Sequence, residues 1–347
     1  MIKALQFLYR LDAKRWLNIK ITEIKPCCGF NLSLLNWNQG IYVGVDSRTA
    51  KFGLKKEMNK IAVLLTCHNR KAKTLSCLAA LYGSNLPEHV SYDVYLVDDG
   101  STDGTKEAVA EQFPEVNILV ADGSLFWAAG SNKAWTAALA AETSYNYYLL
   151  LNDDTLIFPE TFDVFKLDLH RLNSKDIILV GSTYSTPDSR KVSYGGRKLL
   201  KDGDPKSELL LPNGRDPQAI DLGNANIMLV SHTVVEKIGI LTDRYKHGFA
   251  DFEYTLTARK HNIPVMITSK ALGICENDHG KKWLSKGEST LKQRIEYMRS
   301  VKGLSYDNYM KFYKKHFPKH VFREKTKMWM KTIFPWIWDT FKTEKSA

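Results

Sequence analysis

The sequence has no long apolar run, and this absence argues against a helix that crosses a bilayer. None of its apolar stretches approaches the 18 or more residues that a spanning helix needs. The segment MIKALQFLYRLDAKRW at the N-terminus is interrupted by charged residues and lacks a small-residue cleavage site, so it does not read as a secretory signal. We therefore expect a cytoplasmic protein.

Cysteine is scarce, and the few cysteines are scattered. There are five in 347 residues, an odd number, and no CxxC pair occurs among them. This pattern argues against a disulfide framework and against a zinc site, and it fits reduced thiols in a cytoplasmic protein. The cysteines are Cys27, Cys28, Cys67, Cys77 and Cys275.

Acidic residues are outnumbered by basic ones, 38 to 49, which gives a net charge of +11. Such an excess favours polyanionic partners such as nucleic acid, anionic lipid or phosphorylated ligands. A nucleic-acid-binding protein would bind DNA or RNA with a steep salt dependence. No known nucleic-acid module occurs in the sequence, so we expect no nucleic-acid partner. The basic residues concentrate in 281–331, which suggests a surface interaction there.

Residues 1–57 differ in pattern from the rest of the chain. The string CCGFNLSLL, followed by YVGVDS, could be a decayed methyltransferase cofactor loop, with Gly29 at the turn and Asp46 ending the next strand. The Gly-x-Gly that such a loop requires is missing. A small added subdomain or packing arm is the simpler interpretation, whereas the methyltransferase alternative predicts binding of S-adenosylmethionine.

Strand and helix patterns alternate regularly from Lys60 onward. Continuous apolar runs predict buried strands, and segments of helical periodicity lie between them. This alternation predicts an α/β fold with a parallel sheet and helices on both faces, whose ligands bind outside the carboxyl ends of the strands. The predicted strands are 61–66, 92–101, 116–121 and 147–151, and the predicted helices are 73–84, 103–113 and 130–142.

Three of these strands end in polar or acidic residues, in the strings LLTCHNR, LVDDGS and LLLNDDT. Asp98, Asp99, Asp153 and Asp154 would therefore form an acidic rim. Like charges a few ångströms apart resist joint ionisation, so the rim needs a compensating charge. A divalent cation such as Mg²⁺ or Mn²⁺ would supply it, because these ions prefer oxygen ligands and share their coordination with substrate phosphates.

The later part of the chain is less regular. Residues 181–220 are rich in Gly, Pro, Ser and Asp and predict a loop-rich hairpin region that could form a lid on the acceptor side. A strand followed by a helix is predicted over 219–239, a helix over 250–262, and a basic, tyrosine-rich helical stretch over 286–317.

The C-terminal string KMWMKTIFPWIWDTFKTEK alternates tryptophans with lysines. This composition suits the boundary between lipid headgroups and acyl chains, and it predicts a peripheral contact with an anionic membrane. An amphipathic helix packed on a partner subunit is the alternative, so a homo-oligomer stays open. Pro335 should kink any helix through this segment.

Seven strings in sequence order resemble glycosyltransferase family 2, inverting enzymes with the GT-A nucleotide-sugar fold. The resemblance covers about residues 60–285 and continues more weakly to about 317; it implies a GT-A catalytic domain at 58–285, between an extension at 1–57 and a helical region at 286–347. The string DGSLFWAAGSNKAW is similar to bacterial surface-polysaccharide members, particularly rhamnosyltransferase-like ones. The strings are VLLTCHNR, VDDGSTDGT, DGSLFWAAGSNKAW, LLNDDT, GNANIML, FADFEYTLTARKHN and NDHG.

The resemblance implies roles for the residues at the strand ends. Thr66, Asn69 and Arg70 would lie beside the nucleotide base, and Asp98 and Asp99 would hold the base and the ribose by hydrogen bonds.

In the metal motif, Asp154 is expected to ligate the cation on the diphosphate. Asn152 departs from the Asp-x-Asp pattern of the family. Either Asp153 compensates for it on the donor side, or metal binding is weaker than in the family. His279 falls where many members have a further metal or diphosphate contact; a solvent-exposed loop histidine is the alternative.

The same resemblance places the catalytic base at Asp251, where the preceding acid of the family is replaced by Ala250. Glu253 would support the start of this helix or share the role of the base. Arg259 would orient Asp251 or touch phosphate, unless it is a surface arginine. Trp127 would contact the sugar or the acceptor, with core packing as the alternative.

The expected function is therefore that of a metal-dependent, inverting glycosyltransferase that uses Mn²⁺ or Mg²⁺. The donor would be dTDP-rhamnose or a UDP-hexose, and the acceptor a hydroxyl of a growing bacterial surface glycan, such as O-antigen or capsule, or of a polyprenyl-diphosphate-linked glycan. The protein would work in the cytoplasm, peripherally on the inner face of the cell membrane. Asn152 and Ala250 leave a catalytically silent nucleotide-sugar-binding scaffold as the alternative.

Overall fold

The structure is a computed structural model that describes residues 32–37, 40–45, 60–245, 248–276, 284–301 and 303–342. Its internal contacts divide the chain into two units, Met1–Lys55 and Lys56–Ala347. In the first unit, strands β1 (Leu32–Trp37) and β2 (Gly40–Val45) form an antiparallel hairpin. Gly29 and Asp46 of the methyltransferase alternative, and His279, lie outside the described residues.

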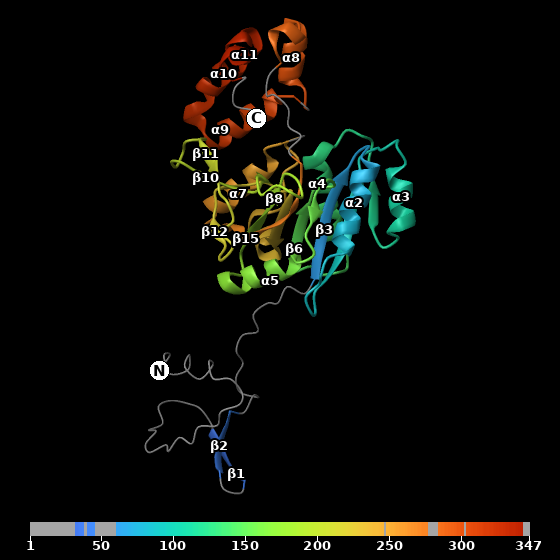
Figure 1. Cartoon of the computed structure of the whole chain (residues 1–347), viewed down its shortest axis with the longest axis vertical. Helices are drawn as coiled ribbons and strands as arrows, with labels where there is room; N and C mark the ends of the chain where they lie inside the picture. The colour runs from blue at the N-terminus through green and yellow to red at the C-terminus, as the bar shows by residue number, and fades with distance from the viewer. Residues whose placement is uncertain are drawn as a thin grey trace. The chain divides into compact units, whose positions relative to one another are not determined.

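The second unit is built on a 10-stranded sheet (Figure 1). Its first half is parallel and confirms the predicted alternation of strands and helices, with β3 next to β4 and β6, and β4 next to β5. The elements of this half are β3 (Lys60–Cys67), α2 (Lys71–Tyr82), β4 (Ser91–Asp98), α3 (Thr105–Gln112), β5 (Asn117–Val120), α4 (Phe126–Ala140) and β6 (Tyr147–Leu151).

The second half of the sheet is mixed. β14 is antiparallel to both β6 and β8, whereas β8 and β15 are parallel. The loop-rich region 181–220 contains short strands as predicted, and two of them, β10 and β11, form a small antiparallel sheet with β13 in the order β11-β10-β13. The elements are β7 (Leu156–Ile157), α5 (Thr161–Leu172), β8 (Ile178–Tyr184), β9 (Val192–Tyr194), β10 (Gly196–Leu199), β11 (Ser207–Leu209), β12 (Gln218–Ala219), β13 (Leu222–Gly223), β14 (Ile227–Ser231), α6 (His232–Ile238), α7 (Ala250–Lys260) and β15 (Val265–Ile274).

Two apolar cores lie on the two faces of the sheet. Successive side chains of a strand point to opposite faces, and in β3 Ala62 and Leu64 enter one core while Ile61, Val63 and Leu65 enter the other. Helices α4 and α7 cover the first core, and α2 and α5 cover the second. This three-layer α/β architecture is the GT-A type of fold that the sequence predicts.

The order of the parallel strands defines where a ligand can bind. The chain passes from β3 outward to β4 and β5 and then returns to place β6 on the other side of β3. In open α/β sheets this reversal leaves a crevice outside the carboxyl ends of the two strands. Here that position lies between Cys67, which ends β3, and Asn152, which follows β6.

The C-terminal region is helical. The predicted stretch 286–317 is not one helix, because the chain leaves the helical conformation between residues 300 and 305. Phe312, Tyr313 and Phe317 join the core that α4 and α7 cover. Pro335 separates the last two helices, as expected. The elements are η1 (Lys286–Glu288), α8 (Leu291–Arg299), α9 (Tyr306–His316), η2 (Pro318–His320), α10 (Val321–Ile333) and α11 (Trp336–Lys342).

Among the described helices, none combines the length and the apolar character that a bilayer span requires.

Candidate functional site

Arg70 joins the ends of β3 and β6 at the reversal of strand order. Its Nη1 lies 3.0 Å from Asp153 Oδ1 and 2.8 Å from Asp154 Oδ2. The resemblance assigns Arg70 to the nucleotide base, and the structure places it against the two acids. The guanidinium therefore supplies part of the positive charge that two adjacent carboxylates need.

The two carboxylates differ in environment. Asp153 is buried, and Thr74 Oγ1 donates a 3.4 Å hydrogen bond to its Oδ2. Burial raises the pKa of Asp153 to about 6, and the charge of Arg70 opposes this shift. The Asp154 side chain is more exposed, at 14% against 7% for Asp153, and its Oδ1 lies 3.6 Å from Cys275 Sγ. Asp153 thus anchors Arg70, and Asp154 is the more accessible of the two acids.

The described residues contain no group of three or more His, Cys, Asp or Glu side chains that could hold a metal ion. Mg²⁺ and Mn²⁺ do not require such a group, because they are often held by one or two carboxylates together with substrate phosphates. The partly buried Asp154 fits this mode of binding, because it is the more accessible of the two acids. The side-chain oxygen of Asn152, at the first motif position, already accepts a hydrogen bond: Trp127 Nε1 donates to Asn152 Oδ1 at 2.8 Å.

Asp98 and Asp99 at the end of β4 are both buried and bind backbone amides. Asp98 Oδ1 accepts from Ser101 N at 2.8 Å. Asp99 accepts from Gly123 N and Leu125 N through Oδ1 and from Phe126 N through Oδ2. Asp99 therefore shapes the segment that leads into α4, in which Phe126 has an unusual positive φ of 58°.

The ends of β3, β4 and β6 converge as the acidic rim requires. Burial raises the pKa of the Cys67 thiol, and the charges of Asp98 and Asp153 raise it further. The Cys67 thiol at the end of β3 therefore lies close enough to the acids that follow both neighbouring strands to interact with their charges.

Thr66 and Asn69 lie at the same edge. Thr66 is buried, and within the described part of the chain its hydroxyl has no hydrogen-bond partner. Asn69 is exposed and ties its loop to the loop after β4: Thr102 N donates to Asn69 Oδ1 at 2.7 Å, and Asn69 N donates to Ser101 Oγ at 3.0 Å.

An open hollow of about 350 Å³ lies beside this loop, at the N-terminus of α2. Its lining includes three basic side chains, and backbone N–H groups at a helix N-terminus add positive potential. The hollow can therefore receive an anionic group. Its lining residues are Asn69, Arg70, Lys71, Ala72, Lys73 and Asp103.

Asp251 occupies the first turn of α7 and is half-buried. Its Oδ1 accepts from Phe252 N at 2.8 Å, and Asn224 Nδ2 donates to its Oδ2 at 3.4 Å. Burial raises the pKa of Asp251 to about 6, although these hydrogen bonds oppose the shift. A carboxylate of this pKa is ionised at neutral pH and still basic enough to accept a proton.

The segment 224–226 connects Asp251 with the NDD motif. Asn224 contacts Asp251, and Asn226 O accepts from Asn152 N at 3.1 Å. Asn226 Nδ2 also lies 3.4 Å from Cys275 Sγ, which in turn contacts Asp154. The string GNANIML signalled this segment, but the sequence did not reveal that its two asparagines and Cys275 link both acids.

The remaining candidates lie elsewhere on α7 and α4. Glu253 is buried and contacts Lys315 Nζ of α9, with His316 Nε2 3.9 Å away. Arg259 Nε pairs with Asp221 Oδ1 at 3.0 Å. Trp127 is only partly buried and lies beside the NDD motif, through its bond to Asn152.

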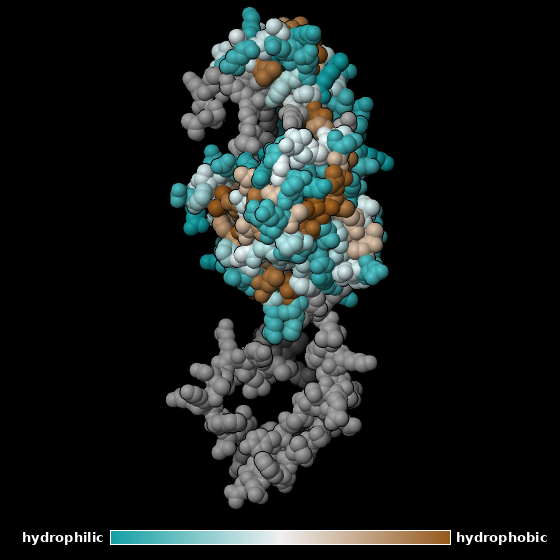
Figure 2. All heavy atoms as spheres, turned by 90° about the vertical axis from the view of Figure 1, so that its right-hand side faces the viewer, coloured by the Kyte–Doolittle hydropathy of each residue, from teal (hydrophilic) through white to brown (hydrophobic). Residues whose placement is uncertain are grey.

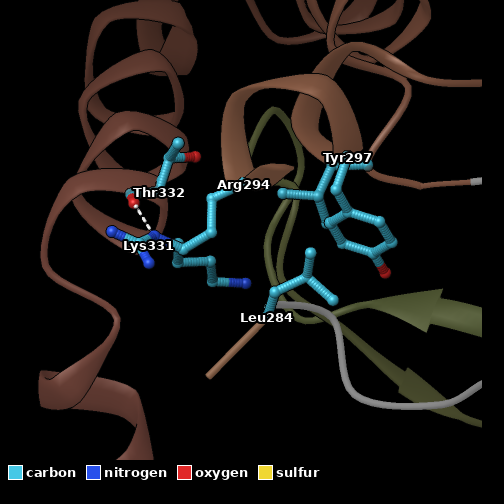
Figure 3. A pocket seen from close by; sticks show the side chains of 6 residues that line it. Leu284, Arg294, Tyr297, Lys331 and Thr332 are labelled. Carbon is cyan, nitrogen blue, oxygen red and sulfur yellow. Dashed lines mark hydrogen bonds between the residues drawn. The ribbon is translucent and has the colours of Figure 1, made fainter. Parts of the chain in front are cut away.

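A second hollow lies between α8 and α10 (Figure 3). Arg294 Nε donates a 2.7 Å hydrogen bond to Thr332 O across it. Its volume of about 10 Å³ has room for about one water molecule, so it belongs to the helix packing and cannot hold a substrate.

One family model matches the parallel half of the sheet and the chain that follows it, as far as the start of β11. Residues 62–207 match the family model described as Glycosyl transferase family 2. This segment contains the ends of β3, β4 and β6 with Arg70, Asp99 and Asp154. The match supports a glycosyltransferase family 2 domain over these residues, consistent with the GT-A type of sheet.

Solved structures also resemble the chain. S. aureus TarS 1–349 in complex with UDP is 17% identical, with 62% of this chain and 60% of that chain covered and a TM-score of 0.46. The mannosyltransferase PcManGT from Pyrobaculum calidifontis, in complex with GDP-Man and Mn²⁺, is 15% identical, with 61% and 57% covered and a TM-score of 0.41. The match thus spans about three fifths of those chains. No curated protein matches the chain in sequence.

Proposed function

We propose that this chain is a metal-dependent, inverting glycosyltransferase that transfers a sugar from a nucleotide diphosphate donor to a hydroxyl group. The observation that carries the proposal is the link through 224–226. This segment contacts Asp251 at one end and reaches Asp154 through Cys275 at the other. The segment 224–226 thus lies between two carboxylates at the carboxyl edge of the sheet. One is Asp251, whose pKa is raised, and the other is Asp154, the more accessible acid of the NDD motif.

Asp251 would act as the general base. Its carboxylate would take the proton of the acceptor hydroxyl while that oxygen attacks the anomeric carbon. The bond from this carbon to the diphosphate would break, so the nucleoside diphosphate leaves and the configuration inverts. Because a pKa of about 6 leaves Asp251 ionised at neutral pH, the transfer rate should fall as the pH drops through about 6.

Asp154 would hold Mn²⁺ or Mg²⁺ together with the phosphate oxygens of the donor, and the cation would neutralise charge on the departing diphosphate. Arg70 keeps Asp153 and Asp154 in place with its bonds to both. His279 remains a candidate for a further contact with the metal or the diphosphate.

The nucleotide would lie along the loops after β3 and β4. Thr66, Asn69 and Asp98 are the candidates for its base and ribose, and the basic hollow at the start of α2 suits an anionic group. Asp99 would contribute by holding the segment that leads into α4, since its oxygens already accept hydrogen bonds from three backbone amides of that segment. We favour dTDP-rhamnose, from the string DGSLFWAAGSNKAW, and a UDP-hexose next. The acceptor would be a hydroxyl of a growing bacterial surface glycan or of a polyprenyl-diphosphate-linked glycan.

A donor-hydrolysis screen tests this proposal. dTDP-rhamnose, UDP-hexoses, UDP-GlcNAc and GDP-mannose are incubated with the protein and Mn²⁺ or Mg²⁺, and nucleoside diphosphate release is measured. We expect release with one donor, its loss on addition of EDTA, and a decrease of at least about a hundredfold in Asp154→Ala. Asp188→Ala, which removes an exposed carboxylate of the hairpin region, is the matched control.

The outcomes separate the alternatives. A wild type that binds a nucleotide sugar but releases no nucleoside diphosphate above the Asp154→Ala level would indicate a catalytically silent scaffold. Steeply salt-dependent binding to DNA or RNA with no affinity for nucleotide sugars would indicate a nucleic-acid-binding protein. Product stereochemistry tests inversion.

We also propose that α10 and α11 contact an anionic membrane on the cytoplasmic side. Large apolar side chains are exposed on these two helices among basic ones. The face of the second unit that Figure 2 shows is mostly hydrophilic, with hydrophobic side chains scattered over it. Phe322 is 82% exposed and Trp336 51%. Phe322 and Ile333 are eleven residues apart on α10, which puts them on one helix face. Residues 284–342 contain 14 Lys and Arg against 5 Asp and Glu, which complements an anionic surface.

Flotation with vesicles tests this contact. The protein should bind phosphatidylglycerol vesicles and not phosphatidylcholine vesicles, and Phe322→Ser combined with Trp336→Ser should reduce binding about tenfold or more. Leu200→Ser removes an apolar side chain that is 61% exposed in the hairpin region and should leave binding unchanged. Absence of vesicle binding, together with a dimer in solution that the double variant dissociates, would favour a partner subunit.

A further inference from the structure

Helix α7 begins after a residue that cannot cap it. Phe249 stands directly before the first turn with a positive φ of 66°, and its side chain makes no capping hydrogen bond. A residue at this position ordinarily has an extended backbone and a side-chain oxygen that accepts from the helix. The left-handed conformation is strained for a bulky residue, so contacts outside α7 must hold Phe249 in it.

Helix α9 supplies these contacts. The ring of Phe249 meets the ring of Tyr309 edge-on, with centroids 5.4 Å apart and planes at 89°, and its centroid lies 5.1 Å from that of Phe312. Both separations lie in the range of favourable aromatic pairs. Tyr309 and Phe312 are three residues apart, which puts them on the same face of α9. Two aromatic contacts thus offset the strain at Phe249.

The two aromatic partners of Phe249 are themselves held in place. Phe312 is buried in the core that α4 and α7 cover. The ring of Tyr309 stacks on that of Tyr313 at 4.5 Å, and its hydroxyl donates a 2.8 Å hydrogen bond to Oε2 of the buried Glu324 in α10. The face of α9 that contacts Phe249 is therefore a fixed support.

The backbone of Phe249 sets the position of Asp251. Phe249 O accepts the opening hydrogen bond of α7, from Glu253 N at 2.8 Å, so its conformation determines where the first turn lies. Asp251 belongs to this turn. Asn224 Nδ2 donates to Asp251 Oδ2 at 3.4 Å, close to the limit for a hydrogen bond, so a small shift of the turn would break this contact.

We infer that Phe249 is a positioning residue for the catalytic base, and that Tyr309 and Phe312 of α9 hold it in the left-handed conformation. The inference rests on the proposed role of Asp251 and deepens it. It gives a part in catalysis to α9, which lies outside the segment 62–207 that matches the family model.

Phe249→Ala and Phe249→Gly separate the ring from the backbone conformation. Both variants lose the two aromatic contacts, but only glycine adopts a positive φ without strain. kcat and KM are measured by nucleoside diphosphate release from dTDP-rhamnose, or from the UDP-hexose, UDP-GlcNAc or GDP-mannose that the donor screen identifies. The temperature is one at which circular dichroism shows every variant to be folded.

We expect kcat to fall at least about tenfold in Phe249→Ala and by less in Phe249→Gly, because a misplaced base slows the chemical step. KM for the nucleotide sugar should stay within about twofold of the wild-type value in both variants, since donor binding is unaffected. Equal losses of kcat in the two variants would mean that only the bulk of the ring matters, and would overturn the role of the left-handed conformation.

Tyr309→Leu and Tyr309→Phe test the support from α9. Leucine removes the ring and phenylalanine keeps it, so kcat should fall about tenfold in the first variant and stay within about twofold of the wild-type value in the second. Tyr309→Leu should have little further effect in Phe249→Ala, because its effect passes through Phe249.

Tyr306→Leu is the matched control on the same helix. Tyr306 is also a partly buried tyrosine, but its ring packs on Trp329 of α10, with centroids 6.4 Å apart. Its removal should leave kcat unchanged. A decrease equal to that of Tyr309→Leu would indicate a general loosening of the C-terminal helices and would overturn the inference.

Hydrogen exchange gives a readout that needs no turnover. In the first turn of α7, the amides of Phe252 and Glu253 are hydrogen bonded. Their exchange, measured by mass spectrometry on peptides that cover this turn, should become about tenfold faster in Tyr309→Leu and stay unchanged in Tyr306→Leu.

Unchanged kcat in Phe249→Ala and Tyr309→Leu would overturn the inference and leave the proposed function intact. A wild type that releases no nucleoside diphosphate would overturn the proposed function, and with it the role of Phe249 in catalysis. Faster exchange in Tyr309→Leu would then still show that α9 holds the first turn of α7, and unchanged exchange would overturn that part as well.

Discussion

At the scale of single residues, Asp251 has the most informative environment. Burial raises its pKa to about 6, so the folded protein favours the protonated form more than the unfolded chain does. A group with a raised acidic pKa stabilises the fold most below its ordinary pKa and loses that contribution as the pH rises through about 6. At neutral pH the ionised Asp251 therefore decreases stability, as is common for a group with the role of base that we propose.

Asp251→Asn should abolish sugar transfer and stabilise the protein. The neutral amide has no charge to desolvate, so the free energy of unfolding at pH 7 should rise by on the order of 1–3 kcal/mol. Thermal unfolding checks this, and the gain should disappear below about pH 4. Nucleotide affinity should stay within about twofold. Retained transfer would remove Asp251 from the role of base, and Asp188→Asn is the control for an exposed site.

Asp98 and Asp99 show how much one sequence motif can predict. The string VDDGSTDGT predicts that a strand ends at these two acids, and β4 ends there. The structure adds that Asp99 uses its two oxygens on the amides of Gly123, Leu125 and Phe126. Sequence alone cannot separate a ligand-binding acid from one that holds a loop, because the difference depends on a segment more than twenty residues away.

At the scale of elements, the close packing of α4 on β3 positions Trp127. Gly130 of α4 allows this approach, since a Cβ at position 130 would lie 2.7 Å from Thr66 Oγ1 and 3.1 Å from Thr66 Cβ. Thr66 is buried and β-branched, so it has little freedom to move away. The glycine thus sets the separation of helix and strand.

Gly130→Ala should therefore destabilise the protein, by about 1–3 kcal/mol. Helix propensity alone predicts the opposite sign, because alanine is favoured over glycine in a helix interior by about 1 kcal/mol. Urea unfolding of the variant decides between these effects. A stabilised variant would mean that α4 and β3 are not in close contact at this position.

At the scale of the whole second unit, the C-terminal helices belong to the same packed structure as the sheet. Aromatic side chains of α9 enter the core under α7, and Glu253 of α7 pairs with Lys315. His316 lies in this interface with a side chain only 1% exposed. Burial lowers its pKa to about 4, and the nearby charges of Lys260 and Lys315 lower it further.

Protonation of His316 should loosen this interface. A histidine with a lowered folded pKa stabilises the neutral-pH fold, and the contribution is lost as the pH falls from about 6.5 toward 4, here by on the order of 2–3 kcal/mol. His316→Leu should remove this loss, so its melting temperature should depend less on pH between 6.5 and 4.5. Exposed His170→Leu is the control. Parallel pH profiles of wild type and His316→Leu would contradict the role of His316.

The predictability of the fold differs between its two halves. Regular apolar runs separated by amphipathic segments predicted every strand and helix from β3 to β6. Helix α5 and strands β8 and β15 were not assigned. β15 contains polar residues such as Thr268 and Ser269, which are buried at an irregularity in its pairing with β8. Ser269 N donates a hydrogen bond to Asp168 Oδ2 there. Such strands are defined by long-range partners and not by local pattern.

By itself, the sequence determined the α/β alternation and the positions of the acids at the strand ends. Hydrophobic periodicity and chain order are local properties, and a parallel sheet places the carboxyl ends of its strands at one edge. Only the tertiary structure decided what each acid contacts. Arg70 between Asp153 and Asp154, the link through 224–226, and the hydrogen bond from Trp127 to Asn152 all join residues from different strands and helices, and hydrogen-bond geometry between distant segments exists only after the chain has folded.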